Sequence, residues 1–284
     1  MQQPVEFNES VSDALLSDIA STAAEAARAA GRIQLSCFRG DHLAAKKSAR
    51  DVKLEVDRRC EEAIVRIIRD RFPGHGILAE EDGFRGGSEP WLWIVDPLDG
   101  TVNFFHGFPQ FCSCVACFRQ PENQPPPVDA IGLLAAAEVG AVYVPVFEEM
   151  YLGIRGCGAT CNGDPVVCNG AHRLSESVVA LSFGKTAEGM ERMLHITGRL
   201  APRVRKLRSW GCAGLDILQV AHGRLGALLY RGIHLWDIAA AGLILSEAGG
   251  HLQACSCNGG RWDMVASVPG LRDELMEVLG SSME

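Results

Sequence analysis

The sequence lacks a long apolar segment, an excess of basic residues and any internal repeat. No apolar run reaches membrane-spanning length, and the first ten residues, MQQPVEFNES, lack the charged-then-apolar pattern of a secretory signal. These absences predict a cytoplasmic protein that does not span a membrane. With 27 lysines and arginines against 35 acidic residues, the formal net charge is −8, which argues against nucleic acid as a partner.

The sequence also lacks the cysteine spacing of a metal knuckle or a disulfide framework, although it contains 11 cysteines. Cys112 and Cys114 lie two positions apart, as do Cys255 and Cys257, but neither pair is followed by a matching second pair. Cys112 and Cys114 alternate with Ser113 in an apolar run, which is typical of a core strand. We therefore expect reduced cysteines with a structural role.

What is present is the composition of a globular protein, with 47% apolar and 22% charged residues among 284. This length allows one large domain or two medium ones. Helical spacing of apolar residues covers residues 11–38 and 57–71. Residues 40–53, between these helices, are polar and rich in lysine and arginine, so we expect a mobile loop there.

The remaining chain contains strand-like and helix-like segments. Strands are predicted at residues 76–78, 91–95, 111–118, 130–139 and 141–146, with an exposed proline-rich hairpin loop at 120–128. The glycine-rich residues 153–163 predict a connection and a domain junction, which divides the chain into 1–155 and 156–284. The second part alternates strand-like and helix-like segments at 178–183, 214–222, 226–229 and 238–248, which predicts an α/β layer.

The segment Asp96-Pro97-Leu98-Asp99-Gly100-Thr101 follows five apolar or aromatic residues that predict a buried strand. Pro97 lacks a backbone donor and has a fixed φ, so we expect a turn that directs both carboxylates and the Leu98 carbonyl to one point. Such hard oxygen ligands suit Mg²⁺. The backbone amides of Gly100 and Thr101, at a predicted helix start, suit an anion. The segment thus predicts a site for a metal and a phosphate.

Two other acidic positions have both a structural and a functional interpretation. Glu80 lies in an acidic triplet directly after a predicted strand, where a solvated turn is the more common outcome. Asp237 precedes a predicted helix, and aspartate is a favourable N-cap. A residue that caps a helix can also bind a metal, so the two interpretations of Asp237 are compatible.

Taken together, Glu80, the Asp-Pro-Leu-Asp-Gly-Thr segment and Trp236-Asp237 resemble the motifs of the inositol monophosphatase family. Other matching stretches are residues 103–107, 156–163 and 246–250, so the resemblance covers nearly the whole chain. It implies a layered αβαβα sandwich, with an N-terminal α+β part and a C-terminal α/β part. It also implies a Mg²⁺-dependent, lithium-sensitive phosphomonoesterase that forms a homodimer and acts on a small phosphorylated metabolite.

Carried over by position, the resemblance also implies a set of site residues. Two or three magnesium ions would be held by Glu80, Asp96, the Leu98 carbonyl, Asp99 and Asp237. Glu80 and Thr101 would position the attacking water, with Asp57 hydrogen-bonded to Thr101, and no covalent phosphoenzyme would form. Asp99 and the amides of Gly100 and Thr101 would contact the substrate. Lys47 and Asp51 fall at the spacing of the family's metal-sensing loop, in which Leu54 replaces a common threonine.

Substrate choice is predicted to depend on later residues. Gly211, Cys212 and Ala213 occupy the positions of a ring-contacting segment, and Tyr230 stands where the family usually has a glutamate that binds an inositol hydroxyl. Arg231 has two interpretations, a contact to a second anionic group or a solvated side chain, of which the solvated one is favoured.

The leading hypothesis is therefore a phosphatase for an inositol phosphate or a similar polyol phosphate. An alternative keeps the chemistry but takes histidinol phosphate, fructose 1,6-bisphosphate or 3′-phosphoadenosine 5′-phosphate. A third hypothesis is a non-catalytic binding homologue. The complete set of predicted ligands argues against it, because clustered carboxylates are costly unless they bind something.

Overall fold

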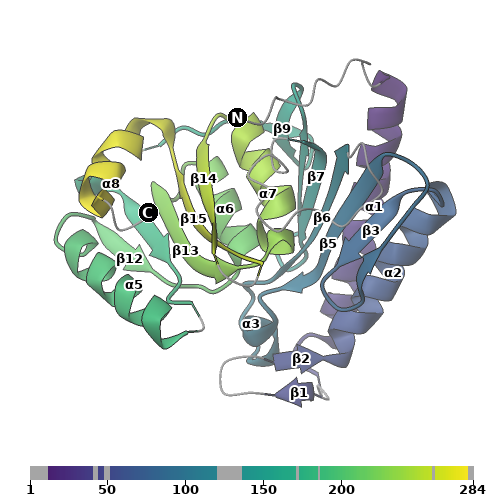
Figure 1. Cartoon of the computed structure of the whole chain (residues 1–284), viewed down its shortest axis with the longest axis horizontal. Coiled ribbons are helices and arrows are strands. Elements are labelled where there is room, and N and C mark those ends of the chain that lie inside the picture. Colours follow the sequence, from purple (N-terminus) through teal and green to yellow (C-terminus); the bar gives the residue numbers. More distant parts are fainter. Residues whose placement is uncertain are drawn as a thin grey trace.

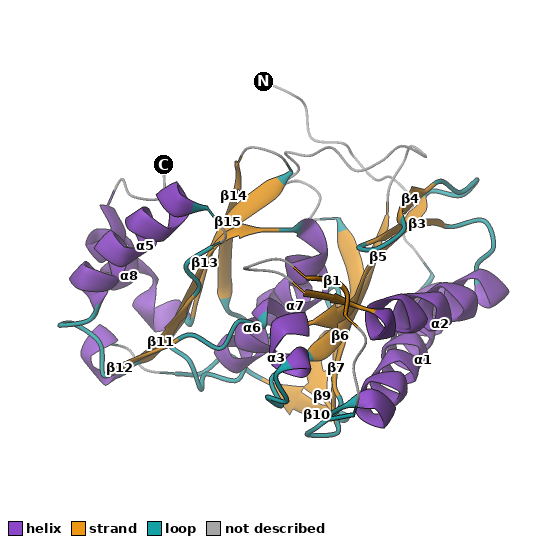
Figure 2. Ribbon diagram, turned by 90° about the horizontal axis from the view of Figure 1, so that it is seen from below, coloured by secondary structure: helices purple, strands orange, loops and turns teal. Residues whose placement is uncertain are grey.

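The structure, a computed structural model, describes residues 12–40, 44–47, 52–119, 136–170, 173–184, 186–257 and 260–280. These residues form five layers, seen edge-on in Figure 1 and from below in Figure 2. Two helices cover the outer face of an eight-stranded sheet, two further helices lie between this sheet and a five-stranded one, and another pair covers the far side. The predicted αβαβα sandwich is confirmed.

The outer helices at the first sheet are α1 (Asp13–Cys37) and α2 (Glu55–Arg71). α1 begins where the Ser12 side chain accepts a hydrogen bond from the Leu15 amide at 3.3 Å, which satisfies one of the unpaired donors of a helix start. The buried face of α1 consists mostly of alanine, so the helix approaches the sheet closely. Both helices confirm the prediction to within a few residues at their ends.

The eight-stranded sheet has the order β10-β9-β8-β7-β6-β5-β3-β4. All described neighbours pair antiparallel except β3 and β5, which are parallel. The strands are β3 (Gly76–Ala79), β4 (Gly83–Arg85), β5 (Trp91–Asp99), β6 (Cys112–Arg119), β7 (Ala137–Val144), β8 (Glu149–Ile154), β9 (Gly158–Cys161) and β10 (Asp164–Val166). Every residue of β5 is buried, which matches its continuous apolar run.

Two predicted interruptions of strands are wrong. β5 does not turn at Pro97 but continues to Asp99, with an irregularity in its pairing to β6 between Asp96 and Asp99. β7 is likewise a single strand through Gly140, where two strands were predicted. A Cβ at Gly140 would lie 2.5 Å from the backbone oxygen of Ala240, so the glycine reflects close packing by a helix and not a turn.

The predicted glycine-rich connection at 153–163 is also wrong, since it contributes β8 and β9 of the first sheet. Positive φ angles at Gly156 and Gly158 form the tight turn between these strands. The expected boundary between residues 155 and 156 would cut this sheet, and the chain passes to the second sheet only after β10. The division of the chain into two domains remains a prediction.

The segment predicted as a mobile loop contains two short antiparallel strands, β1 (Ala44–Lys47) and β2 (Val52–Leu54). Lys47 is the last residue of β1, whereas Asp51 lies outside the described residues. The predicted hairpin loop at 120–128, and the part of the predicted strand before residue 136, also lie outside them.

The five-stranded sheet has the order β12-β11-β13-β15-β14, in which β11 runs parallel to both of its neighbours. Its strands are β11 (Val178–Leu181), β12 (Lys206–Arg208), β13 (Ala227–Ile233), β14 (His251–Cys257) and β15 (Arg261–Ser267). Helices α6 (Ala213–Ala221) and α7 (Leu235–Glu247) lie between the sheets, and α5 (Ala187–Leu200) and α8 (Arg272–Leu279) cover the far side. The predicted α/β alternation is confirmed.

Shorter elements complete the fold, namely α3 (Thr101–Phe105) and the 3₁₀ turns Leu174–Glu176 and Pro269–Leu271. Within the described ranges, no helix combines the length and the apolar character needed to cross a membrane. All 11 cysteines are free. Cys112 and Cys114 are buried in β6, as their alternation predicts.

Candidate active site

Three carboxylates from distant parts of the chain meet between the two sheets. Asp96 and Asp99 lie at the end of β5, and Asp237 lies in the first turn of α7. Each offers an oxygen, and the three oxygens lie within 4.8 Å of one another. Asp96 and Asp99 are buried, with 1% and 8% exposure, while Asp237 is half-buried. The structure therefore brings together three of the predicted metal ligands.

The backbone at the end of β5 is held by hydrogen bonds from both sides. The Leu98 amide donates to Asp96 Oδ1 at 3.0 Å, which fixes that carboxylate against its own strand. Gln34, a fully buried residue of α1, donates from Nε2 to the Pro97 carbonyl at 2.8 Å. Sequence reasoning missed Gln34. Its only signal is an isolated polar residue on an apolar helix face.

Asp99 is positioned by the start of α6. The Gly214 amide donates to Asp99 Oδ2 at 2.6 Å, and the Cys212 thiol lies 3.1 Å from the same oxygen. Amides at a helix N-terminus carry partial positive charge, so they stabilise the carboxylate. A Cβ at Gly214 would lie 2.8 Å from Cys114 Sγ and 3.1 Å from Asp99 Oδ2, so only glycine fits without a shift. Sequence reasoning missed Gly214.

Asp237 takes a different structural place from the predicted one. His234 is the N-cap of α7, and Asp237 is the third helical residue, whose Oδ2 accepts a hydrogen bond from the His234 amide at 2.7 Å. The prediction that Asp237 is the N-cap is therefore wrong, because the helix begins earlier, at Leu235. Asp237 instead completes a capping box, which fixes its carboxylate at the helix start.

Glu80 lies in a turn that the rest of the protein holds in place. The Glu80 amide donates to the Val95 carbonyl at 3.2 Å, and the buried Glu61 of α2 accepts from the Glu81 and Asp82 amides at 2.8 and 2.9 Å. The side chain of Glu80 is half-buried and close enough to Asp96 for its charge to raise the pKa of Asp96. The turn is thus more than a solvated acidic loop.

Thr101 begins α3 after Gly100, whose φ of +86° and contact with the Gln110 carbonyl exclude a side chain. The Thr101 hydroxyl lies 2.9 Å from the Leu98 carbonyl and 3.3 Å from Asp57 Oδ1, and its single proton serves one of them at a time. The expected contact between Asp57 and Thr101 is present, and Asp57 is buried.

The electrostatics of the cluster favour a bound cation. Burial raises the pKa of Asp96 well above its ordinary value, and the charges of Glu80 and Asp99 raise it further. Burial also raises the pKa of Asp99, while hydrogen bonds from Cys212 and Gly214 lower it. Buried like charges are costly unless a counter-charge joins them. A divalent cation with oxygen ligands supplies that charge, so the donor set fits Mg²⁺.

A softer metal fits less well, although Cys112 and Cys114 offer sulfur atoms close to Asp99. Thiolates are the metal-binding form of cysteine. Hydrogen bonds with Cys114 and Cys212, together with burial, raise the pKa of Cys112 well above its ordinary value. The neutral thiol is therefore strongly favoured at Cys112.

The predicted substrate contacts are only partly open to a ligand. Gly211 has a φ of +74° and open space where a Cβ would stand, but the Cys212 side chain and Ala213 are buried. Tyr230, which is 4% exposed, donates its hydroxyl proton to Asp216 Oδ2 at 2.7 Å. A contact between Tyr230 and a substrate hydroxyl would thus have to use the tyrosine oxygen as acceptor.

The favoured interpretation of Arg231 as a solvated side chain is wrong. Its side chain is only 14% exposed, and Nη2 forms an ion pair with Asp263 Oδ2 at 2.6 Å. Sequence spacing did not reveal this pair, because Asp263 belongs to β15 while Arg231 belongs to the neighbouring strand β13.

With this geometry established, the comparison with known proteins identifies the class. The Inositol monophosphatase family matches residues 15–279, so the chain belongs to this family and is a phosphoric monoester hydrolase. The "Inositol monophosphatase 1" of Solanum lycopersicum is 32% identical over 93% of this chain and 95% of its own length. The "Fructose-1,6-bisphosphatase/inositol-1-monophosphatase" of Aquifex aeolicus is 31% identical over 84% of this chain and 86% of its own length.

A solved structure agrees with the fold. The extragenic suppressor protein suhB of Bartonella henselae superposes with a TM-score of 0.81, at 27% identity, over 92% of this chain and 98% of that one. The family consists of metal-dependent phosphatases, generally with Mg²⁺, that act on small phosphorylated metabolites.

Proposed function

We propose that this protein is a Mg²⁺-dependent phosphomonoesterase that hydrolyses an inositol monophosphate or a similar polyol phosphate by direct attack of water. The observation that carries the proposal is the convergence of oxygens from Asp96, Asp99 and Asp237 within 4.8 Å, largely shielded from solvent. Such a group is costly alone and becomes favourable when divalent cations join it.

The residues that would hold two or three magnesium ions are Glu80, Asp96, the Leu98 carbonyl, Asp99 and Asp237. When bound, the ions supply positive charge for the phosphoryl oxygens and the leaving oxygen in the transition state. The chain's own residues are already oriented for this task. Asp99 is held by Gly214, and Asp237 by the His234 amide.

Proton transfer and substrate orientation fall to Glu80, Thr101 and Gly100 in this proposal. Glu80 accepts a proton from the attacking water at its carboxylate. The Thr101 hydroxyl orients that water, while Asp57 and the Leu98 carbonyl set the direction of the hydroxyl. The amides of Gly100 and Thr101 bind the phosphate. No protein nucleophile is needed, because water attacks phosphorus directly.

The proposal also concerns which phosphorylated metabolite the enzyme hydrolyses. The Aquifex relative is named for both a sugar bisphosphate and an inositol monophosphate, so one scaffold of this family is associated with both kinds of substrate. In this chain the ring-binding glutamate is replaced by Tyr230, whose proton is donated to Asp216. This favours testing other polyol and sugar phosphates beside inositol 1-phosphate. We also expect a homodimer, which light scattering during size-exclusion chromatography measures.

The experiment is a phosphate-release panel with inositol 1-phosphate, histidinol phosphate, fructose 1,6-bisphosphate and 3′-phosphoadenosine 5′-phosphate. We expect release that requires Mg²⁺ and is inhibited by lithium. Glu80→Gln should lower kcat by about 10²-fold or more and weaken substrate binding much less, because it removes the proton acceptor but keeps an amide oxygen that can still bind the metal. Glu62→Gln, an exposed position on α2, is the matched control. Release without added metal, or normal turnover in Glu80→Gln, would contradict the proposal.

A further inference from the structure

Three thiols lie directly beside Asp99, one of the predicted magnesium ligands. Cys112 and Cys114 lie on one face of β6, and Cys212 is the N-cap of α6. Cys112 Sγ lies 3.8 Å from Cys114 Sγ and 3.7 Å from Cys212 Sγ. All three side chains are buried. We call these three cysteines and Asp99 the thiol cluster.

The distances within the thiol cluster are those of a tetrahedral zinc site. Asp99 Oδ2 lies 3.1 Å from Cys212 Sγ and 3.7 Å from Cys112 Sγ. Asp99, Cys112 and Cys114 also offer ligand atoms that all lie within 4.8 Å of one another. Tetrahedral Zn²⁺, with Zn–S bonds of about 2.3 Å and a Zn–O bond of about 2.0 Å, holds its sulfurs about 3.8 Å apart and its oxygen about 3.5 Å from each sulfur. The donor atoms therefore need only small shifts to bind this ion.

Gly214, the second residue of α6, leaves room beside these donor atoms. A Cβ at this position would lie 2.8 Å from Cys114 Sγ, 3.1 Å from Asp99 Oδ2 and 3.2 Å from Cys112 Sγ. All three donors thus border one space, which any side chain other than hydrogen would occupy. The absence of a Cβ at Gly214 keeps this side of the thiol cluster uncovered, and a cation can lie between this space and the donors.

The thiol cluster shares Asp99 with the carboxylates, but it suits a different cation. Mg²⁺ takes oxygen ligands, so it leaves the thiols protonated. Zn²⁺ binds sulfur strongly, and a thiol that coordinates it releases its proton to the solvent. Asp99 is 8% exposed, whereas the thiols are almost completely buried, so a cation reaches the sulfur atoms by way of Asp99. The shared carboxylate is therefore both a ligand and the point of entry.

We propose that the thiol cluster is a second metal site, which binds Zn²⁺ and thereby inhibits the Mg²⁺-dependent reaction. Zn²⁺ at this site places two positive charges beside Asp99, so the carboxylates attract Mg²⁺ less strongly. The binding of Zn²⁺ follows from the thiol cluster alone, whereas the inhibition rests on the proposed phosphatase function.

The binding is tested without a substrate, with Co²⁺ as a spectroscopic probe for Zn²⁺. Co²⁺ bound to thiolates gives a sulfur-to-metal charge-transfer band in the near ultraviolet, which Co²⁺ bound to carboxylates does not give. We expect this band when Co²⁺ is added to the reduced enzyme in the presence of Mg²⁺, and its loss when Zn²⁺ displaces Co²⁺. Competition with a chromophoric chelator gives the Kd for Zn²⁺. The absence of the band in the wild-type enzyme would overturn the inference.

Two variants and a control locate the bound metal. Cys112→Ala and Cys114→Ala should each raise the Kd for Zn²⁺ by about tenfold or more and weaken the charge-transfer band, because a ligand is lost. Cys117→Ala is the matched control, since Cys117 is buried in the same strand but lies on its opposite face, and it should change neither quantity. A band of full strength in both variants would place the metal at other cysteines, and an equal loss in the control would show an unspecific effect. Either result would refute the site.

A second measurement tests the inhibition and separates it from the proposed function. At about ten times its Kd, Zn²⁺ should raise the Mg²⁺ concentration for half-maximal phosphate release by about tenfold, and Cys114→Ala should need correspondingly more Zn²⁺. Calorimetric titration with Mg²⁺, with and without Zn²⁺, measures the same competition even if no substrate releases phosphate, in which case the proposed function alone fails. An unchanged affinity for Mg²⁺, or equally strong inhibition in Cys114→Ala, would show that Zn²⁺ does not act through the thiol cluster.

Discussion

The carboxyl ends of β5 and β13 both border the candidate site, but they carry side chains of opposite charge. The end of β5 carries buried carboxylates whose pKa values are raised and whose oxygens accept hydrogen bonds from Leu98, Gly214 and Cys212. The end of β13 carries Arg231, which pairs with Asp263 and whose buried Nη1 has no hydrogen-bond partner among the described residues. Several hydrogen bonds hold the carboxylates of the first region, whereas one ion pair with Asp263 holds the guanidinium group of the second.

Asp96→Asn tests the first region and should have the largest effect. Mg²⁺-dependent phosphate release should fall by about 10²–10³-fold or more, because a central ligand is lost. The metal-free variant should unfold at a higher temperature than wild type, since burial and neighbouring charges raise the pKa of Asp96 and make its ionised form unfavourable.

Phosphate release and thermal unfolding with and without Mg²⁺ measure both effects. Asp164→Asn, at an exposed position of β10, is the control and should change neither. Near-normal activity in Asp96→Asn would show that the metal assignment is wrong.

Gly214→Ala tests whether the backbone positions Asp99. The new methyl group would come within 2.8 Å of Cys114 Sγ and 3.1 Å of Asp99 Oδ2, so one of them must move. We expect a loss of about 1–3 kcal/mol of stability from overpacking, with kcat reduced by about tenfold.

The matched control is Gly198→Ala in the last turn of α5, where no atom lies within 4 Å of the added methyl group. It should stabilise the protein by about 0.5–1 kcal/mol. Chemical denaturation and steady-state kinetics distinguish the two variants, and equal behaviour of both would count against a positioning role for Gly214.

Asp216→Asn probes the region beneath β13 and should have the smallest effect on phosphate release. Burial raises the pKa of Asp216 from 3.8 to about 7, although a hydrogen bond from Tyr230 lowers it. The folded state therefore binds more protons than the unfolded state between these two values, so wild-type stability falls as the pH rises through this range.

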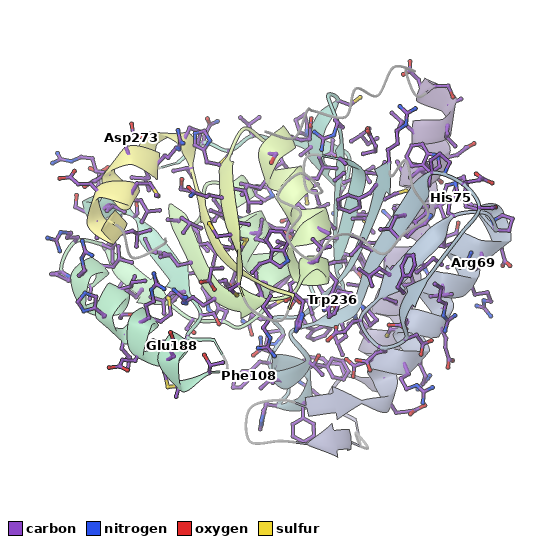
Figure 3. The ribbon with its side chains drawn as sticks, in the orientation of Figure 1. Arg69, His75, Phe108, Glu188, Trp236 and Asp273 are labelled. Carbon is purple, nitrogen blue, oxygen red and sulfur yellow. The ribbon has the colours of Figure 1, made fainter. Side chains whose placement is uncertain are left out.

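Asparagine does not titrate, so the stability of Asp216→Asn relative to wild type should rise by about 3 kcal/mol between pH 4 and 7 and then level off. Melting temperatures across this range measure the difference. Asp273→Asn, exposed on α8 (Figure 3), is the control. Parallel profiles of Asp216→Asn and wild type would show that Asp216 is not the titrating group.

The sequence predicted the helices, most strands and the acidic positions because these signals are local. Periodicity marks α1 and α2, and the run before Asp96 marks β5. The exact partners of Asp99 could not be predicted, because Gly214 and Cys212 meet it only through tertiary packing. The local effect of proline predicted a turn at Pro97, but β5 stays extended there because it pairs with β6 on both sides, at Asp96 and at Asp99.

The substrate side was harder to predict for a related reason. The family resemblance identified Tyr230 and its neighbour Arg231 as the positions to examine, but not the direction of their side chains. In a strand, successive residues point to opposite faces, so one residue of slip exchanges their roles. Tyr230 donates a hydrogen bond to Asp216 on α6, while Arg231 forms an ion pair with Asp263 on β15.

The contact between Gly140 and Ala240 has a consequence for how this family scaffold can vary. Because Gly140 has no side chain, the backbone of β7 contacts the backbone of α7 directly and fixes the distance between α7 and the first sheet. Asp237, one turn earlier in α7, therefore takes its position from the sheet that carries Asp96 and Asp99. Changes in the second sheet can then alter the surroundings of Arg231 without moving Asp237 relative to Asp96 and Asp99.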